Sequence, residues 1–242
     1  MNTRTNQLKI LISGGGGLLG TVLQAIDPAI IAPLREEMDV CDKASIDAAL
    51  AKYKPDVFIH AAAFTSPPRC DEHPMLALET NIIGTGNAVL SAEEHGVRLV
   101  YISTDYVFKG DSGMYLEDDE LLPQNLYAWS KLGGECAVRA SANALIIRTS
   151  FSPDEFPYDA AFVDQYTSRD SVSVIAGLIL QVVSADVKEQ IIHVGTDRKS
   201  VKELALKLGK EDVKDLRRDE VSFSAPRDTS FNTELLDKYL NT

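Results

Sequence analysis

Short runs of apolar, mostly β-branched residues recur along this chain of 242 residues, and segments of helical periodicity lie between them. This alternation is typical of βα units, in which helices cover both faces of a parallel sheet. We therefore predict an α/β fold with a doubly wound parallel sheet. The predicted strands are Lys9–Ile12, Ile30–Leu34, Val57–His60, Leu99–Ser103, Leu145–Arg148 and Ile191–Val194. The predicted helices are Leu18–Ile26, Lys43–Lys54, Met75–His95, Asn125–Ser141, Asp170–Ser184, Val201–Leu208 and Thr233–Leu240.

Four consecutive glycines, Gly14–Gly17, follow the first predicted strand, and Gly20 lies inside the next helix. The run satisfies G-x-G-x-x-G when read from Gly15 and G-x-x-G-x-x-G when read from Gly14. In this context the backbone passes close to a dinucleotide pyrophosphate, and the free N–H groups of the helix N-terminus point at it. A flexible turn would also contain glycines, but the position between a strand and a helix favours a dinucleotide site.

The alternation is regular up to residue 151 and becomes shorter and less regular beyond it. We expect residues 1–151 to form a Rossmann-like domain that binds NAD or NADP. Residues 152–242 are expected to form a small C-terminal substrate lobe that packs on this domain. A chain of this length accommodates both parts as one compact unit.

The residues that would distinguish NAD from NADP are less clearly marked. Asp39 has about the spacing of the acidic residue that binds the adenine ribose, yet it comes several residues after the predicted strand end at Leu34. Arg35 follows that strand end directly, where a cation can hold the 2′-phosphate of NADP. A solvated surface arginine would look the same. The sequence therefore favours NADP slightly and leaves NAD as the alternative.

The charge balance argues against several classes of protein. Lys and Arg number 24 and Asp and Glu number 36, and the net charge of −12 disfavours wide contact with nucleic acid or an anionic membrane. The three cysteines and four histidines are scattered, so neither a disulfide framework nor a metal site is expected. No apolar run reaches the ~20 residues of a membrane span. We therefore expect a cytoplasmic protein that binds a small molecule.

Tyr127 and Lys131 are four residues apart in a predicted helix, so their side chains share one face. When a hydride reaches a carbonyl carbon, the carbonyl oxygen needs a proton, and a phenol can donate it. A neighbouring ammonium favours the phenolate and is expected to bring the pKa of Tyr127 towards neutrality. Lys131 would also reach the ribose of the nicotinamide. An ordinary exposed pair has the same spacing, so the motif needs support from other residues.

That support comes from the segment Ser103–Phe108, which follows the fourth predicted strand. Ligands bind at the carboxyl ends of parallel strands, and Thr104 lies at such an end. Its hydroxyl can donate a hydrogen bond to a substrate oxygen, and Asp105 can orient a sugar hydroxyl. A polar loop that merely ends the strand is the alternative. Together with the glycine loop and the Tyr127/Lys131 pair, the segment favours a catalytic site.

Several segments in a fixed order carry a resemblance to a known family. They are GGGGLLG (14–20), MDVCD (38–42), PDVFIHAAAFT (55–65), NIIGTGNAV (81–89), LVYISTDYVFKG (99–110), YLEDDELLPQNLYAWSKLGGE (115–135), IIRTSF (146–151), DQYTS (164–168) and APRDTSFNT (225–233). The chain resembles the dTDP-4-dehydrorhamnose reductase family of the extended short-chain dehydrogenase/reductase superfamily. The resemblance is nearly continuous through residue 151 and thinner beyond it.

The resemblance implies a role for each matching position. The residues implied to hold the cofactor, with Gly14 from the glycine motif, are Gly14, Gly17, Leu18, Leu19, Asp39, Val40, Ala62, Ala63, Phe64, Thr65 and Ile102. Thr104, Tyr127 and Lys131 would form the catalytic set, and Tyr127 and Lys131 would also contact the cofactor. Asp105 and Phe151 would face the substrate sugar. Phe64 is explained equally well by packing, and Phe151 stands where the family commonly has a tryptophan.

Family members reduce a 4-keto sugar on a nucleotide carrier, often for polysaccharide biosynthesis. The resemblance implies an NAD(P)H-dependent reductase of a nucleotide-activated 4-keto-6-deoxy sugar, with Tyr127 as general acid. Only residues 152–161 separate Phe151 from FVDQYTS, where the family has a further helix and strand. Such a shortened lobe would fit a smaller substrate, a partner chain, or a cofactor-binding regulatory subunit without turnover. A nucleotide-sugar epimerase or dehydratase is a further alternative, and a homodimer is one expected assembly, since helix pairs often form dimers in this superfamily.

Overall fold

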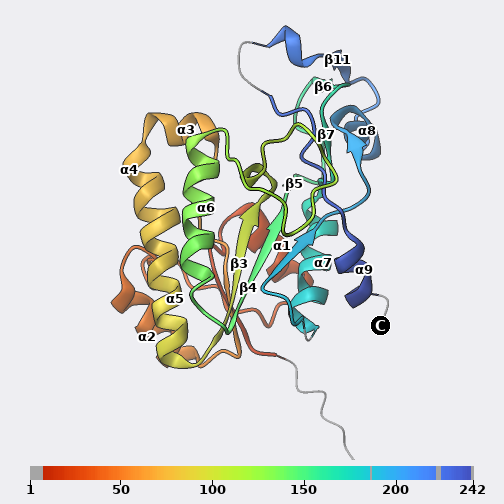
Figure 1. The fold of residues 1–242 in the computed structure, drawn as a ribbon. Coiled ribbons are helices and arrows are strands. Elements are labelled where there is room, and N and C mark those ends of the chain that lie inside the picture. The colour runs from red at the N-terminus through yellow and green to blue at the C-terminus, as the bar shows by residue number, and fades with distance from the viewer. Residues whose placement is uncertain (1–7, 186, 222–224, 241–242) are drawn as a thin grey trace, which may run out of the picture.

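The computed structural model describes residues 8–185, 187–221 and 225–240. A parallel sheet of five strands forms its centre, with the spatial order β1-β2-β3-β4-β9 and helices on both faces (Figure 1). Its strands are β1 (Ile10–Ser13), β2 (Val57–His60), β3 (Arg98–Thr104), β4 (Ala144–Thr149) and β9 (Ile191–Val194). The predicted α/β fold with a Rossmann-like parallel sheet is confirmed. No helix in the described ranges is long and apolar enough to cross a membrane.

The helices lie close to their predicted positions, and polar caps mark several of their starts. Asn125 accepts a hydrogen bond from Ala128 N at the start of α6, and Ser200 forms a capping box with Glu203 at the start of α8. The α-helices are α1 (Leu18–Ile26), α2 (Lys43–Tyr53), α3 (Pro67–Glu72), α4 (Pro74–Ala77), α5 (Gly84–His95), α6 (Leu126–Val138), α7 (Val172–Ser184), α8 (Val201–Lys207) and α9 (Glu234–Leu240). Shorter helical segments are η1 (Leu78–Ile83, π-helical), η2 (Asp105–Val107) and η3 (Arg218–Glu220).

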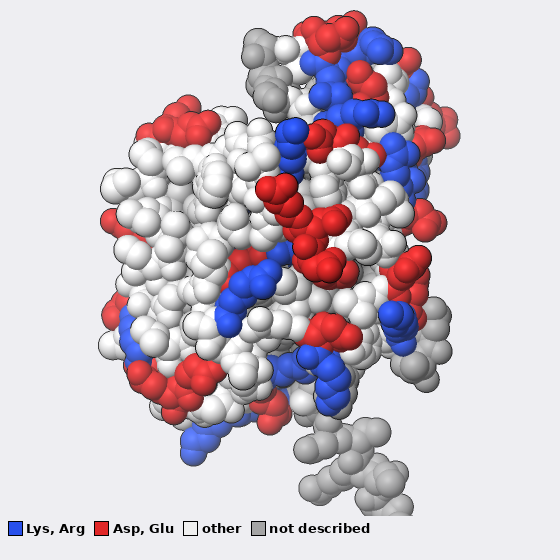
Figure 2. Space-filling model, in the orientation of Figure 1, with Lys and Arg blue, Asp and Glu red and all other residues white. Residues whose placement is uncertain are grey.

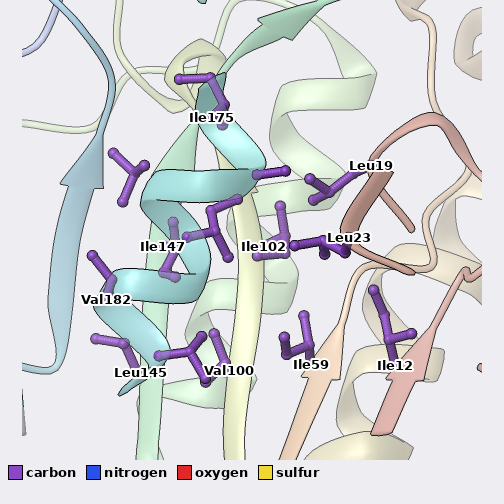
Figure 3. Close-up of a cluster of buried hydrophobic side chains, with 14 of the residues drawn as sticks. Ile12, Leu19, Leu23, Ile59, Val100, Ile102, Leu145, Ile147, Ile175 and Val182 are labelled. Carbon is purple, nitrogen blue, oxygen red and sulfur yellow. The ribbon is translucent and has the colours of Figure 1, made fainter. Parts of the chain in front are cut away.

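Alternate residues of each strand face the two layers of helices, as the two-residue period of a strand requires. On one face, Ile12, Ile59 and Val100 pack with Leu23 of α1 and Val182 of α7 (Figure 3). The other face packs against α2, α5 and α6 through a second cluster. Its fully or almost fully buried members include Leu11, Phe58, Tyr101, Ile46, Leu50, Ala88 and Val138. Both faces of the sheet are therefore buried under helices, and the carboxyl edge of the sheet is left for a ligand-binding site.

The chain after residue 152 contributes to both the sheet and the lobe. Strand β9 joins the central sheet beside β4, and α7 and α9 pack on the face that carries α1. The lobe above the sheet contains three two-stranded pairs and helix α8 (Figure 1). These pairs are β5 (Phe151–Ser152) with β8 (Asp170–Ser171), β6 (Ala160–Phe162) with β11 (Lys214–Leu216), and β7 (Tyr166–Thr167) with β10 (Lys199–Ser200).

The predicted strand Ile30–Leu34 is wrong in extent. Only Ile31 forms a bridge, with Leu11, through hydrogen bonds of 2.8 Å from Ile12 N to Ile31 O and 2.9 Å from Ile31 N to Ile10 O. Pro33 has no N–H group to continue the ladder. The segment therefore borders β1 as a single bridge, which is enough to lead Arg35 to the carboxyl edge of the sheet.

The predicted helix Met75–His95 is divided into α4, η1 and α5. The π-helical segment η1 in the middle widens the helix by one residue, a feature that is frequent at functional sites. Asn81 lies in this segment and is buried. The wider turn directs its side chain towards the loop after β2, a contact described below.

Two buried histidines make the stability of the fold sensitive to acid. Burial lowers the pKa of His60 and of His193 to about 3 in the folded chain, from about 6.5 when exposed. The unfolded chain therefore takes up protons that the folded chain excludes between pH 6.5 and 3. Each histidine is expected to lower the free energy of unfolding by about 1.4 kcal/mol per pH unit of acidification in this window.

His193→Phe tests this expectation, because His193 stacks on Phe231 and neither of its ring nitrogens has a hydrogen-bond partner in the described residues. The free energy of unfolding is measured by urea denaturation at pH 6.5, 5.5 and 4.5. Its slope against pH should be shallower in the variant by about 1.4 kcal/mol per pH unit. His73→Asn at an exposed position is the control and should keep the wild-type slope. Equal slopes for wild type and His193→Phe would contradict the assignment.

Candidate functional site

A cavity of about 720 Å³ opens at the carboxyl edge of the sheet. It runs from the glycine loop after β1, past the ends of β2, β3 and β4, to the lobe. Every site residue predicted from the sequence except Phe64 lines it: Gly14, Gly17, Leu18, Leu19, Arg35, Asp39, Val40, Ala62, Ala63, Thr65, Ile102, Thr104, Asp105, Tyr127, Lys131 and Phe151. One cavity therefore brings together the two halves of the predicted site.

The glycine loop can accept a pyrophosphate without a change of backbone. Gly14 has a φ of +75°, and a Cβ there would lie 2.8 Å from the backbone nitrogen of Ala62. A Cβ at Gly20 would lie 2.5 Å from Gly14 O, so both positions require glycine. Gly17 caps α1 without a side chain, which leaves first-turn N–H groups of α1 available for phosphate oxygens. The loop therefore fits a dinucleotide.

Arg35 and Asp39 lie together at the far end of this cofactor half. Arg35 Nε donates a hydrogen bond of 3.2 Å to Asp39 Oδ2, and the Arg35 side chain is 76% exposed. Asp39 also accepts from Cys41 N at 3.0 Å. The Arg35 guanidinium and this backbone N–H hold the pKa of the Asp39 carboxyl below its usual value, although partial burial opposes them. Both residues line the cavity, and the Asp39 carboxylate partly neutralises the Arg35 guanidinium.

The loop after β2 is held by Asn81, which sequence reasoning did not assign to the site. Asn81 Oδ1 accepts from Phe64 N at 2.7 Å, and Asn81 Nδ2 donates to Phe64 O at 2.9 Å. Asn81 Nδ2 also donates to Ser130 Oγ of α6 at 2.8 Å. The Phe64 ring lies under the guanidinium of Arg69, 4.8 Å from its centroid, and does not line the cavity. Phe64 does not line the cavity, so its contact with a cofactor stays a prediction, whereas Ala63 and Thr65 on either side of it face the cavity.

Lys131 is almost fully buried and is fixed by two contacts. Its Nζ donates a hydrogen bond of 2.7 Å to Ile102 O and lies 4.1 Å from the centroid of the Tyr101 ring. Burial lowers the pKa of Lys131 to about 7, although the Glu135 carboxylate one turn further along α6 opposes this. The ammonium therefore lies at the floor of the cavity, between the strand end that carries Ile102 and the face of α6 that carries Tyr127.

Tyr127 does not have the lowered pKa that its spacing from Lys131 predicts. Burial raises the pKa of the phenol well above its usual value, and the neighbouring Thr104 hydroxyl only partly opposes this. The Tyr127 ring packs edge-on against Tyr106, with centroids 6.4 Å apart. The expectation was wrong because Lys131 Nζ is held at Ile102 O and does not counter the loss of solvation. A raised pKa keeps the phenol protonated at neutral pH, which is the form that can donate a proton.

The loop after β3 is tied to the lobe through Asp105. Thr104 Oγ1 donates to Asp105 Oδ1 at 3.2 Å, and Thr229 Oγ1 donates to Asp105 Oδ2 at 2.7 Å. Burial raises the pKa of Asp105, whereas the charge of Arg169 and these hydroxyl groups oppose the shift. Asp105 borders the cavity but is 2% exposed. It therefore links Thr104 to the APRDTSFNT segment, besides facing the substrate half.

A buried ion pair joins α6 to the central sheet. Glu135 of α6 accepts from Arg148 Nε at 3.0 Å and from Arg148 Nη2 at 2.9 Å. Ser103 Oγ donates to the same carboxylate at 2.6 Å. The Glu135 and Arg148 side chains are fully buried. Because Ser103 precedes Thr104 on β3 and Arg148 lies on β4, the pair holds α6 against both strands that form the substrate half.

Sequence reasoning also missed Tyr106, Ser150 and Arg169, which line the substrate half. Tyr106 and Ser150 adjoin predicted residues and were within reach of the same argument. Arg169 directly follows the DQYTS segment, but only the pairing of β7 with β10 brings it over the sheet. No group of three metal-binding side chains occurs in the described parts of the chain.

Residues 8–179 match the RmlD substrate binding domain family. Among curated proteins, the chain is 36% identical over 149 residues to the spore coat polysaccharide biosynthesis protein SpsK of Bacillus subtilis, covering 59% of this chain and 53% of SpsK. It is 30% identical over 208 residues to the dTDP-4-dehydrorhamnose reductase of Mycolicibacterium smegmatis, covering 76% of this chain and 63% of that protein. It is also 33% identical over 141 residues to the methionine adenosyltransferase 2 subunit beta of Bos taurus, covering 54% of this chain and 42% of that subunit. The chain thus spans between two fifths and two thirds of the length of these relatives.

Solved structures match almost the whole chain. A hypothetical dTDP-4-dehydrorhamnose reductase from Sulfolobus tokodaii aligns with a TM-score of 0.83 at 29% identity, covering 97% of this chain and 96% of that one. A dTDP-4-dehydrorhamnose reductase from Bacillus anthracis in complex with NADP aligns with a TM-score of 0.84 at 26% identity, covering 97% and 91%. The chain therefore covers nearly all of each of these two structures.

The family match covers well over half of the chain, and the fold, the glycine loop and the Tyr127/Lys131 pair agree with it. The chain belongs to the RmlD substrate binding domain family, within the extended short-chain dehydrogenase/reductase superfamily.

Proposed function

We propose that the protein is an NAD(P)H-dependent reductase of a nucleotide-activated 4-keto-6-deoxy sugar. The observation that carries the proposal is a single cavity in which the glycine loop lies at one end and Thr104, Tyr127 and Lys131 lie at the other. The M. smegmatis relative and the B. anthracis structure are named as dTDP-4-dehydrorhamnose reductases, and their names support the substrate class. The SpsK likeness supports a role in polysaccharide biosynthesis.

The side chains of the substrate half divide the chemistry between them. A nicotinamide cofactor, when bound by the glycine loop and the residues after β2, supplies the hydride for the keto carbon. Tyr127 donates a proton to the keto oxygen, and the Thr104 hydroxyl turns from Asp105 to hydrogen-bond the same oxygen. Lys131, on the same face of α6 as Tyr127, orients the cofactor ribose, and its protonated form adds positive charge beside the keto oxygen. Phe151, on the lobe side, packs against the sugar.

The test is the oxidation of NADPH and NADH by the purified protein with dTDP-4-keto-6-deoxyglucose, dTDP-4-keto-rhamnose and their UDP analogues. Turnover with at least one of them, and formation of the corresponding alcohol, is the expected result. Binding of both cofactors is measured separately by fluorescence titration. Cofactor binding without turnover on any sugar would contradict the proposal.

We further propose that the cofactor is NADP, with NAD as the weaker alternative. The half that holds the cofactor has Arg35 as a cation beside the predicted adenine ribose, and the B. anthracis neighbour is in complex with NADP. Arg35→Ala is expected to raise the Kd of NADPH about 10-fold and to leave the Kd of NADH unchanged, because only NADPH has a 2′-phosphate. The exposed Arg139→Ala is the control and should change neither Kd. An equal loss of affinity for NADPH and NADH would show that Arg35 does not bind the 2′-phosphate.

One observation favours a second function, a cofactor-binding regulatory subunit without turnover. The chain is 33% identical over 141 residues to a methionine adenosyltransferase 2 subunit beta, a relative that is named as a subunit and not as a reductase. This alternative predicts tight cofactor binding and no NADPH oxidation with any sugar. The panel above therefore separates the two functions.

A homodimer stays a prediction. Helices α4, α5 and α6 present a surface largely free of charged side chains, whereas charges of both signs gather over the lobe (Figure 2). Exposed large apolar residues on this helical surface are Met75, Leu76, Leu78, Ile83, Leu90 and Trp129. Sedimentation at several concentrations of the protein tests the assembly.

A further inference from the structure

Arg169 lies in the substrate half of the cavity, in the turn between β7 and β8. Its Nε donates a hydrogen bond of 3.0 Å to Ser150 Oγ, one residue beyond the end of β4. The last residues of β3 and β4, Thr104 and Thr149, are register partners. Arg169 therefore lies close to the strand end where the keto oxygen is proposed to bind.

The backbone of this turn is fixed by hydrogen bonds from the lobe. Arg169 N donates to Thr167 Oγ1 at 3.0 Å, and Lys199 Nζ donates to Arg169 O at 3.0 Å. Lys199 Nζ is held in turn by Thr196 Oγ1 at 2.7 Å, and Thr196 N donates to Ser168 O at 2.9 Å. The guanidinium is thus carried by a prearranged support, as a binding residue requires.

Within the described residues, the Arg169 guanidinium forms no ion pair. The carboxylate of Asp105 lies near enough for the charge of Arg169 to lower its pKa against burial, but its two oxygens accept from Thr104 and Thr229. The two other cations of the cavity differ, since Arg35 is paired with Asp39 and Lys131 is bonded to Ile102 O. A guanidinium has five N–H donors, and Ser150 and the Tyr106 phenol each engage one of them, so enough remain for an oxyanion.

We propose that Arg169 is a substrate-binding residue that holds an oxyanion of the substrate in a bidentate manner. This inference rests on the proposed function, because it assigns one group of the nucleotide-sugar to one side chain. A nucleotide-activated sugar offers this chemistry in the diphosphate of its carrier and, where the sugar is an acidic one, in the carboxylate of that sugar. Binding of the diphosphate agrees with a 6-deoxy sugar, whereas binding of a carboxylate would mean that the natural substrate contains an acidic sugar.

Calorimetric titrations of the NADP-saturated protein distinguish these sources. The probes are UDP, dTDP, UDP-glucose and UDP-glucuronate, and the last two differ only in the carboxylate at C6. The variants are Arg169→Ala, Arg169→Lys and the control Arg139→Ala, which removes one exposed positive charge away from the cavity. Thermal unfolding and cofactor titration of each variant verify that the fold and the cofactor half are intact.

Arg169→Ala is expected to weaken at least one probe by roughly 10- to 100-fold, as the loss of a charge-assisted bidentate contact does. An equal loss for all four probes assigns Arg169 to the diphosphate. A loss confined to UDP-glucuronate, which the wild type would then prefer over UDP-glucose, assigns it to the sugar carboxylate. Arg169→Lys should restore part of the affinity, because it keeps the charge and loses the planar fork.

Unchanged affinities in Arg169→Ala would overturn the inference while leaving the proposed function intact. If the wild type binds NADP but none of the four probes at millimolar concentration, the nucleotide-sugar site itself fails, and the inference fails with it. Arg139→Ala should match the wild type throughout, and a loss there equal to that of Arg169→Ala would show that net charge alone, not the site, determines binding.

Discussion

Tyr127→Phe is expected to lower kcat by about 10²- to 10⁴-fold, because the variant lacks the proposed general acid. Phenylalanine keeps the ring that packs edge-on against Tyr106, so the free energy of unfolding and the Kd of the cofactor should stay near wild type. The measurement is NADPH oxidation with the best sugar of the panel, under single-turnover conditions that separate the chemical step from product release.

Tyr106→Phe is the matched control, because it also removes a phenol hydroxyl group and Tyr106 lines the same cavity. It should lower kcat by less than about 10-fold, because Tyr106→Phe leaves the proposed general acid in place. Comparable rates for wild type and Tyr127→Phe would remove Tyr127 from the mechanism. Burial holds the pKa of Tyr127 above its usual value, so kcat should not fall through deprotonation of this phenol between pH 6 and 9.

Glu135→Leu is expected to reduce the free energy of unfolding by about 3–5 kcal/mol, the cost of leaving a buried charge without its partner. Arg148 is fully buried, and its two hydrogen bonds to Glu135 would be lost together with the one from Ser103. Urea denaturation at pH 7 measures the change.

A second variant separates the ion pair from simple packing. Glu135→Leu combined with Arg148→Met replaces both charges with apolar groups of similar size and should be more stable than Glu135→Leu alone. Arg148 also donates to Glu117 O at 3.0 Å, so some loss relative to wild type remains. A free energy of unfolding for Glu135→Leu within 1 kcal/mol of wild type would show that the pair does not stabilise the junction of α6 with β3 and β4.

The strands of the central sheet were predictable because the apolar runs that form them are local signals. Runs such as Val57–His60 and Ile191–Val194 are apolar except for one histidine each, as a strand buried on both faces requires, and the structure has both strands with these bounds. The predicted strand Ile30–Leu34 was wrong in extent, because an apolar run that forms a single bridge has the same sequence pattern as one that forms a longer strand. The π-helical segment that contains Asn81 was not predicted, because the spacing of hydrophobic residues does not reveal one extra residue in a single helical turn.

Among the site residues, Tyr127 and Lys131 were predictable because their spacing on one helix is a local property. Their pKa values were not, because solvation depends on everything that packs around them. Burial raises the pKa of Tyr127 and lowers that of Lys131 to about 7, the reverse of a simple charge-pair argument for the phenol.

By itself, the sequence determined the α/β class, the glycine loop and the order of Thr104, Tyr127 and Lys131 along the chain, because each depends on residues close together in sequence. The tertiary structure alone decided that Glu135 meets Arg148, that Thr229 reaches Asp105 across 124 positions, and that Arg169 enters the cavity. These contacts join different elements of the fold, and only the packing of helices and lobe on the sheet brings those elements together.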